Sequence, residues 1–215
     1  MNLQTFLPSI PALLSGFGTT LLLSLASAIL ATFLGVLAAA ARFSRVPVVA
    51  QISYLYVQVF RGTPLLITLL FVYFGTAGLG IHVNLFVAAT LGLSIYTGAY
   101  IGEIVRSGLE AVPMSQWEAS QILGLKRPAT FFNIILPQTG RVVLPPLFGQ
   151  YIALVKDSSL ASMIGAAELM RHGQAVIDCV GQPIVVYAAV AVLYFIVCYP
   201  LSLWVRRLEQ RNRAA

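Results

Sequence analysis

Charged side chains are scarce in this chain of 215 residues. Asp, Glu, Lys and Arg together make up 9% of it, and hydrophobic residues make up 59%. A soluble globular domain carries roughly 25% charged residues, because its surface faces water. So few charges cannot cover such a surface, which excludes an ordinary soluble domain. The composition therefore predicts an integral membrane protein.

The sequence also lacks the motifs of several kinds of catalytic and binding site. Cys179 and Cys198 stand in no CxxC or other metal-ligand spacing. His82 and His172 belong to no HExxH motif and have no third ligand nearby, so both are interpreted as structural or solvated. The chain has no phosphate-binding G-x-x-x-x-G-K-[ST] loop and no G-x-S-x-G nucleophile elbow. We therefore expect no catalytic residue, no metal and no cofactor in this chain.

Acidic residues are outnumbered by basic ones, and the formal net charge is +6. Polytopic membrane proteins are commonly basic, because Lys and Arg gather in their cytoplasmic loops. A nucleic-acid-binding surface would instead show a stripe of basic residues interleaved with aromatics, which this sequence lacks. No nucleic-acid partner is predicted.

Five apolar segments reach or approach the roughly 20 residues that a helix needs to cross a bilayer. Pro64 and Pro145–Pro146 suit the first turn of the second and fourth segments, and Thr63 and Asn84 suit the caps of the second and third. The five predicted transmembrane helices cover approximately residues 19–41, 64–78, 84–106, 145–164 and 183–205 of a single permease-like domain, 1–215.

Lys and Arg are unevenly distributed over the connections. All of them except Lys156 and Arg171 lie between the first and second predicted helices, between the third and fourth, or after the fifth, and Arg61 is counted in the first group. An excess of positive charge marks the cytoplasmic side. The N-terminus is therefore predicted outside and the C-terminus inside, with the connection over residues 109–141 in the cytoplasm.

The third predicted helix carries two further patterns. Ser94, Gly98 and Gly102 recur every four residues, and such a stripe of small side chains lets another helix approach closely. Glu103 and Arg106 are spaced three residues apart and can pair on one helix face. At the cytoplasmic end of this helix, the pair is predicted to snorkel or to form a structural clamp to the connection over residues 109–141, or else to act directly in a gate.

The cytoplasmic connection contains the interrupted apolar stretch WEASQILGLKRPATFFNIILP. Ser115 and Glu118 have the spacing of a capping box, and Gly124 is expected to end the following short helix with a positive φ. A second short helix is predicted from Pro128 to Pro137. Two such helices could form a membrane-surface connector or a docking surface for a cytoplasmic partner.

The same stretch resembles the EAA signature of ABC importer permeases. It has the order Glu-Ala-x-x-x-x-Gly, nine residues and Ile-x-Leu-Pro, with a serine in place of the second alanine. Four segments resemble the polar amino acid branch of that family, its glutamine- and histidine-type permeases: FRGTPLL (60–66), AYIGEIVRSG (99–108), KDSSL (156–160) and VRRLEQR (205–211). The residues that the resemblance assigns to ATPase coupling are Glu118, Ala119, Ser120, Gly124, Ile134, Leu136 and Pro137.

The resemblance implies an all-α, type I ABC importer-like permease with a cytoplasmic coupling helix, embedded in the lipid of the bacterial cytoplasmic membrane. Two permease subunits, either copies or homologues, would form the pore for a polar amino acid. A dimer of cytoplasmic ABC ATPase subunits would dock on the EAA loop and bind ATP and Mg. A periplasmic solute-binding protein would deliver the substrate.

A second pair of charges falls inside the fourth predicted helix. Lys156 lies eleven residues after Pro145, which is roughly 16 Å at 1.5 Å per residue and places it near the middle of the bilayer. Ionisable residues at that depth are costly and indicate function. Lys156, Asp157, Ser158 and Ser159 are predicted to contact the substrate or to form a gate or inter-helix pair. Both charges can face one point only if the helix is distorted at the serines.

A stand-alone channel or an ion-coupled carrier for a small polar solute would share this composition. A secondary carrier would normally need more helices and an inverted repeat, which the sequence does not show. Neither alternative would use a docking helix. The leading prediction is therefore the pore subunit of an ATP-driven importer.

Overall fold

The computed structural model describes residues 6–44 and 46–213. This part of the chain is helical and contains no strand, which confirms the all-α prediction. Its elements are η1 (Leu7–Ser9), α2 (Ile10–Arg42), α3 (Pro47–Gly62), α4 (Leu65–Gly78), α5 (Leu85–Glu110), α6 (Met114–Ile122), α7 (Arg127–Thr130), the π-helical turn η2 (Phe131–Ile135), α8 (Leu136–Asp157), the 3-10 helix η3 (Ser158–Ile164), α9 (Leu169–Val180) and α10 (Pro183–Arg213).

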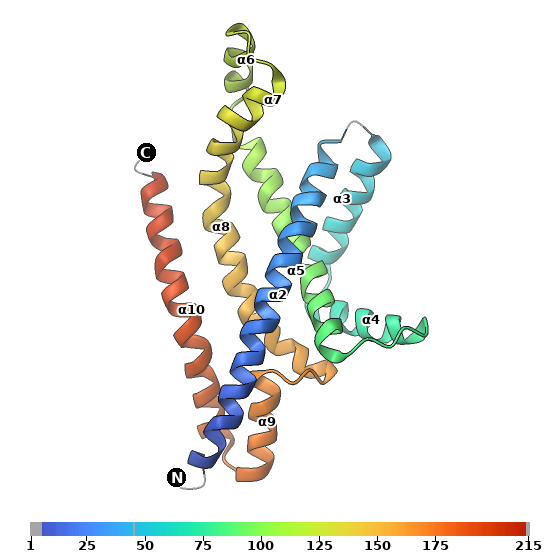
Figure 1. Ribbon diagram of the computed structural model, residues 1–215, viewed down its shortest axis with the longest axis vertical. Coiled ribbons are helices and arrows are strands. Elements are labelled where there is room, and N and C mark those ends of the chain that lie inside the picture. Colours follow the sequence, from blue (N-terminus) through green and yellow to red (C-terminus); the bar gives the residue numbers. More distant parts are fainter. Residues whose placement is uncertain (1–5, 45, 214–215) are drawn as a thin grey trace.

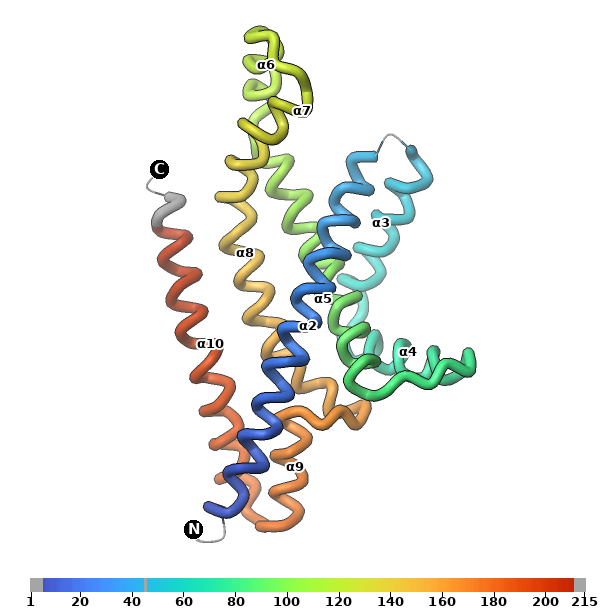
Figure 2. The backbone as a smooth tube through the Cα atoms, viewed as in Figure 1, coloured from blue at the N-terminus to red at the C-terminus, as the bar shows by residue number. Residues whose placement is uncertain are grey.

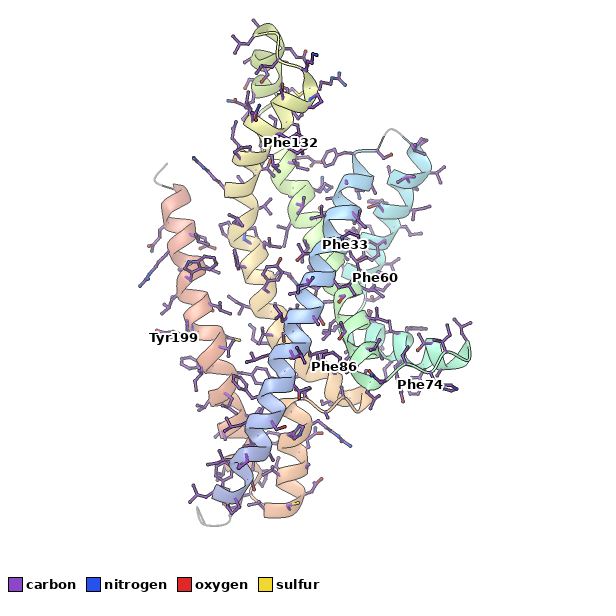
Figure 3. The ribbon with its side chains drawn as sticks, in the orientation of Figure 1. Phe33, Phe60, Phe74, Phe86, Phe132 and Tyr199 are labelled. Atoms are coloured by element: carbon purple, nitrogen blue, oxygen red, sulfur yellow. The ribbon has the colours of Figure 1, made fainter. Side chains whose placement is uncertain are left out.

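The molecule is elongated, and the start of α2 and the end of α10 lie toward opposite ends of its long axis, with α6 and α7 extending further than the end of α10 (Figure 1). α2 and α10 run along this axis. α6 and α7 occupy one extreme end and α9 the other, as the tube in Figure 2 shows. Large apolar side chains face outward along the length, among them Phe33 of α2, Phe74 of α4 and Tyr199 of α10 (Figure 3). An outer surface of this kind suits lipid rather than water.

α2 and α5 form the tightly packed centre of the fold. A Cβ added at Gly102 would lie 3.3 Å from the Gly35 carbonyl oxygen, and one added at Gly35 would lie 2.9 Å from the Gly98 carbonyl oxygen. Ser94 Oγ donates a hydrogen bond to the Ser27 carbonyl oxygen at 3.2 Å. The prediction that these small residues of α5 admit another helix is confirmed, and that helix is α2.

The second predicted helix, 64–78, corresponds to α4, and a further helix that was not predicted, α3, precedes it. The axes of α3 and α4 differ by 113°. α4 has 14 residues, roughly 21 Å at 1.5 Å per residue, so it is too short to cross a hydrocarbon core of about 30 Å alone. The prediction that Thr63 caps α4 was wrong. Its Oγ1 donates to the Val59 carbonyl oxygen of α3 at 3.0 Å, and Pro64 occupies the N-cap.

The fourth predicted helix begins earlier than expected. The chain continues from α7 through η2 into α8, so Pro137 stands in the first turn of α8 and closes no short helix. Pro145 and Pro146 lie inside α8 and do not open it. Membrane helices tolerate internal prolines where neighbouring helices support the backbone, and α8 packs against α5 and α10. The α-helix then ends at Asp157, where η3 begins.

Within the part of the chain that the structure describes, three helical stretches are long and apolar enough to cross a membrane: Leu7–Arg42, Leu85–Glu110 and Pro183–Gln210. The bent pair α3–α4 adds a fourth if it counts as one broken span. Asn84 caps α5 as predicted, because its Oδ1 accepts from the Val87 backbone N–H at 2.8 Å. α10 starts at Pro183, also as predicted. The count of five spans and their orientation stay predictions.

Candidate functional site

The stretch that resembles the EAA signature forms a rigid projection at one end of the molecule. α6 ends in a Schellman turn: the Leu125 N–H donates to the Ser120 carbonyl oxygen and the Gly124 N–H to that of Gln121, both at 3.0 Å. Gly124 has a φ of +75°, as predicted for this position. The capping box was wrong, because Pro113 is the N-cap and Ser115 already lies in the first helical turn.

The tip of this projection is apolar and exposed. Ile122 is 86% exposed and Leu123 76%. Among the seven predicted coupling residues, Glu118, Ala119, Gly124, Leu136 and Pro137 are exposed, Ile134 is half-buried and Ser120 is buried. The Ser120 Oγ donates to the Gln116 carbonyl oxygen at 2.6 Å. A small residue is therefore needed at position 120 for packing within the chain, while most of the other coupling residues face outward.

The predicted pair on α5 is present and belongs to a larger charge cluster. Arg106 donates to both carboxylate oxygens of Glu103, from Nε at 3.0 Å and from a terminal nitrogen at 2.6 Å. Arg106 also pairs with Glu110. Arg61 of α3 lies 3.7 Å from Glu103. Arg61 stands fourteen residues after Pro47, roughly 21 Å along α3. It therefore lies in the last turn of a helix, and counting it with a loop between the first and second predicted helices was wrong.

Lys156 and Asp157 lie at the end of α8, away from the Glu103 cluster. Lys156 is exposed and Asp157 half-buried. The chain changes from α-helical to 3-10 winding at Ser158, so the helix is distorted at the serines, the condition under which both charges could face one point. The hydroxyls of Ser158 and Ser159 donate to the carbonyl oxygens of Val155 and Lys156, each at 2.8 Å.

The depth of Lys156 had been counted from Pro145, which is not the start of its helix. Lys156 is twenty residues from Leu136, the first residue of α8, or roughly 30 Å along it. Its neighbourhood is nevertheless central, because it interacts electrostatically with Cys198, halfway along α10. Likewise Asp157 interacts with Tyr96, near the middle of α5.

A polar stripe on α5 lies between the two charge groups, and its two tyrosines were not among the predicted site residues. The Tyr96 and Tyr100 hydroxyls lie 3.2 Å apart, and the guanidinium of Arg61 lies over the Tyr100 ring, 5.5 Å from its centroid. Tyr96, Tyr100 and Glu103 follow one another at helical spacing on one face. That spacing was the available signal. The stripe runs along α5 from Tyr96, which is within electrostatic reach of Asp157, to the Glu103–Arg106 pair.

Glu168, a buried carboxylate between η3 and α9, was also missed. It is fully buried and accepts from the backbone N–H groups of Met170 and Arg171 at 2.9 and 2.8 Å. The Tyr194 hydroxyl and the Thr20 hydroxyl donate to it from α10 and α2. A buried charge is tolerated only when it is hydrogen-bonded in this way. Glu168 therefore fixes the start of α9 to both long helices.

The predicted structural role of His172 agrees with its surroundings. Its ring packs where a Cβ on Gly16 would stand, 2.8 Å away. Its Nδ1 lies 3.1 Å from the Glu168 carbonyl oxygen. His172 thus adds to the packing of α9 against α2.

Comparison with known proteins agrees with this arrangement. Residues 31–214 match the family described as binding-protein-dependent transport system inner membrane component. The L-cystine transport system permease protein TcyB of Bacillus subtilis is 37% identical, over 94% of this chain and 86% of its own length. The glutamine transport system permease protein GlnP of Escherichia coli is 37% identical, over 96% of this chain and 95% of its own.

Solved structures show the same fold. A crystal structure of an amino acid ABC transporter with histidines contains a chain with a TM-score of 0.92 and 29% identity, covering 98% of this chain and 99% of that one. An inward-facing structure of the MetNI methionine ABC transporter superposes with a TM-score of 0.77 at 23% identity, covering 99% of each chain, and supports the fold alone. Because the family match covers residues 31–214, which is most of the chain, the chain belongs to the inner membrane components of binding-protein-dependent transport systems.

Proposed function

We propose that this chain is the pore-forming permease subunit of an ATP-driven importer that carries a polar amino acid across the bacterial cytoplasmic membrane. A second permease, a copy or a homologue, completes the pore. A dimer of ABC ATPase subunits docks on the α6–α7 projection and binds ATP and Mg, and a periplasmic solute-binding protein delivers the substrate. The names of the glutamine and cystine permeases among its relatives support the substrate class.

The observation that carries this proposal is the exposed apolar tip of α6. Ile122 and Leu123 are the last residue and the C-cap of α6. α6 stands at the far end of the molecule (Figure 1), and its end is fixed by the Gly124 turn. Exposed apolar side chains on a rigid helix are typical of a helix that docks into a groove. The chain has no phosphate-binding loop of its own, so a partner that hydrolyses ATP must receive this helix.

The route of the substrate follows the polar stripe of α5 in this proposal. Lys156, Asp157 and the 3-10 turn at Ser158 and Ser159 form its outer part. Glu103 and Arg106 form its cytoplasmic part. A zwitterion needs fixed partners of both signs when it leaves water, and the stripe offers both at each end.

We expect Lys156→Met and Asp157→Asn to lower uptake by about tenfold or more, because each removes one charge from the outer part of the route. Protein level and co-purification with the ATPase should be unchanged, since neither side chain is buried. Uptake and ATPase stimulation should be measured together, because a gate affects stimulation whereas a binding residue affects substrate affinity. Full uptake in both variants would show that Lys156 and Asp157 are not part of the substrate route.

Reconstitution tests the proposed function directly. The permease is purified with its neighbouring ATPase, placed in liposomes and supplied with the binding protein and labelled polar amino acids. Uptake should require ATP and the binding protein together. Uptake that proceeds without ATP would instead support a stand-alone channel or carrier.

Cysteine labelling of spheroplasts tests the five-span topology with the N-terminus outside. Cys179 is exposed near the end of α9, and Ser115 is exposed on α6 at the other end of the molecule. With Cys198→Ala as background, a membrane-impermeant maleimide should label Cys179 in intact spheroplasts. In a Cys179→Ala background, Ser115→Cys should react only after permeabilisation. The reverse labelling pattern would show that the chain has the opposite orientation in the membrane.

A further inference from the structure

A small pocket of about 240 Å³ opens between the end of α3, the cytoplasmic half of α5 and α8. Its wall includes Arg61, Tyr100, Glu103, Ser107 and Pro146. Pockets for drug-sized ligands have volumes of roughly 300–1,000 Å³, so this one suits a smaller molecule, such as a free amino acid. The arginine and the glutamate provide both signs of charge within it.

The positive charge of Arg61 is only partly compensated by its neighbours. Glu103, 3.7 Å away, is beyond hydrogen-bond distance. Both oxygens of that carboxylate already accept from Arg106. The Tyr100 ring lies under the guanidinium and attracts it through the ring face. No residue of the described chain accepts a hydrogen bond from Arg61, and its side chain is 37% exposed. Its N–H donors are therefore available to a ligand.

We propose that Arg61 binds the α-carboxylate of the transported amino acid in this pocket, an inference that rests on the function proposed above. A guanidinium holds a carboxylate through two parallel N–H···O bonds, which an ammonium group cannot reproduce. Glu103 and the Tyr100 hydroxyl supply acceptors for the α-ammonium group. The zwitterion thus exchanges water for partners of both signs.

Because Arg61 and Glu103 form only a loose ion pair, little free energy is lost when Arg61 leaves Glu103 to bind a substrate carboxylate. When Arg61 turns toward a substrate carboxylate, Glu103 keeps its two hydrogen bonds from Arg106 and is not left as an unpaired charge. The site also lies on the polar stripe, because Tyr100 lines it. Tyr96, whose hydroxyl is 3.2 Å from that of Tyr100, lies on the side of the site that is nearer to Asp157. The substrate reaches Arg61 after it passes the Lys156–Asp157 pair.

Equilibrium binding of a labelled amino acid to the purified permease–ATPase complex, without the binding protein, tests the assignment. The probe is an amino acid that the wild-type complex imports, with glutamine and cystine tried first. Arg61→Gln should weaken binding by about tenfold or more, and Arg61→Lys by less, because lysine keeps the charge but loses the two-pronged contact. Arg42→Gln is the matched control, since Arg42 also lies over a tyrosine ring, 4.8 Å from the Tyr54 centroid, but outside the pocket. It should change affinity by less than about twofold.

A competition assay separates contact with the substrate from a structural role. The same amino acid with its α-carboxylate converted to an amide should compete about tenfold less well for the wild type, and Arg61→Gln should abolish this preference. A preference that persists in Arg61→Gln would overturn the inference, as would unchanged affinity. If Arg61→Gln does not assemble with the ATPase, Arg61→Lys carries the same comparison.

The uptake assay keeps the two proposals distinguishable. A wild-type complex that imports no amino acid contradicts the proposed function and the Arg61 site with it. A wild-type complex that imports an amino acid, but binds it no better than Arg61→Gln does or not at all, contradicts only the Arg61 site.

Discussion

The α2–α5 interface and the tip of α6 differ in how much of their surface is buried within the chain. Along the interface, glycines bring two backbones so close that a Cβ at Gly35 would meet a carbonyl oxygen at 2.9 Å. At the tip, Ile122 and Leu123 contact little of the chain and leave most of their surface open. The interface is complete within one chain, whereas the tip gains apolar contacts only when a partner covers it. In the proposed function, this chain combines a core that is fully packed by itself with a tip that another subunit buries.

The largest expected effect comes from filling the interface. Gly35→Val places methyl groups against the Gly98 carbonyl oxygen and Ile101. Overpacking of this kind costs about 1–3 kcal/mol or more, and here backbone atoms would have to move. The thermal unfolding temperature of the detergent-purified chain should fall markedly. Gly18→Val on the same helix is the control, because nothing lies within 4 Å of its added Cβ; equal stability of the two variants would mean that this interface is not tightly packed.

A smaller effect, confined to assembly, is expected from the tip. The double variant Ile122→Ser/Leu123→Ser removes apolar surface that a partner would bury, and burying one such side chain contributes about 1.5–3 kcal/mol. The dissociation constant for the ATPase should rise by about a hundredfold while the unfolding temperature stays near the wild-type value. The control Leu79→Ser alters a side chain that is 79% exposed on the turn after α4. Loss of ATPase affinity in the control as well would show that exposure alone, and not position, governs assembly.

The smallest of the three effects is expected from the turn that holds the tip. Gly124 has a φ of +75°, a conformation that costs a residue with a Cβ roughly 1–2 kcal/mol. Gly124→Val should therefore reduce ATPase affinity by about tenfold and weaken the coupling of ATP hydrolysis to uptake. Gly75→Val, at an open site without a positive φ, should behave as the wild type. Normal coupling in Gly124→Val would show that the turn can be rebuilt without glycine.

The parts of the fold that the sequence predicted were those governed by local chemistry. Asn84 caps α5, Gly124 ends α6, and the small residues of α5 receive α2, because each depends on a few neighbouring residues. The Glu103–Arg106 pair was predicted for the same reason, from its helical spacing. Belonging to the permease family was predictable because the EAA spacing is a long and specific pattern.

The features that were missed depend on contacts between distant segments. Pro145 looks like a helix start in sequence, yet the support of neighbouring helices lets α8 continue through it. Arg61 was assigned to a loop because α3 was not predicted as a helix. Glu168 has no partner nearby in sequence apart from backbone N–H groups, and the hydroxyls of Thr20 and Tyr194 reach it only in the folded chain. The coupling and transport roles of the predicted site residues remain proposals.

The central claim is that another subunit buries the tip of α6. Maleimide labelling of Leu123→Cys in nanodiscs, with Cys179 and Cys198 replaced by alanine, tests this claim most directly. Leu123 is 76% exposed, so it should react rapidly in the isolated chain. Adding the partner ATPase should slow the labelling of Leu123→Cys by about tenfold or more, because a docked helix is shielded from solvent. Labelling of Leu79→Cys in the same background should not change. Equal labelling of Leu123→Cys with and without the ATPase, under conditions where the complex forms, would contradict the account.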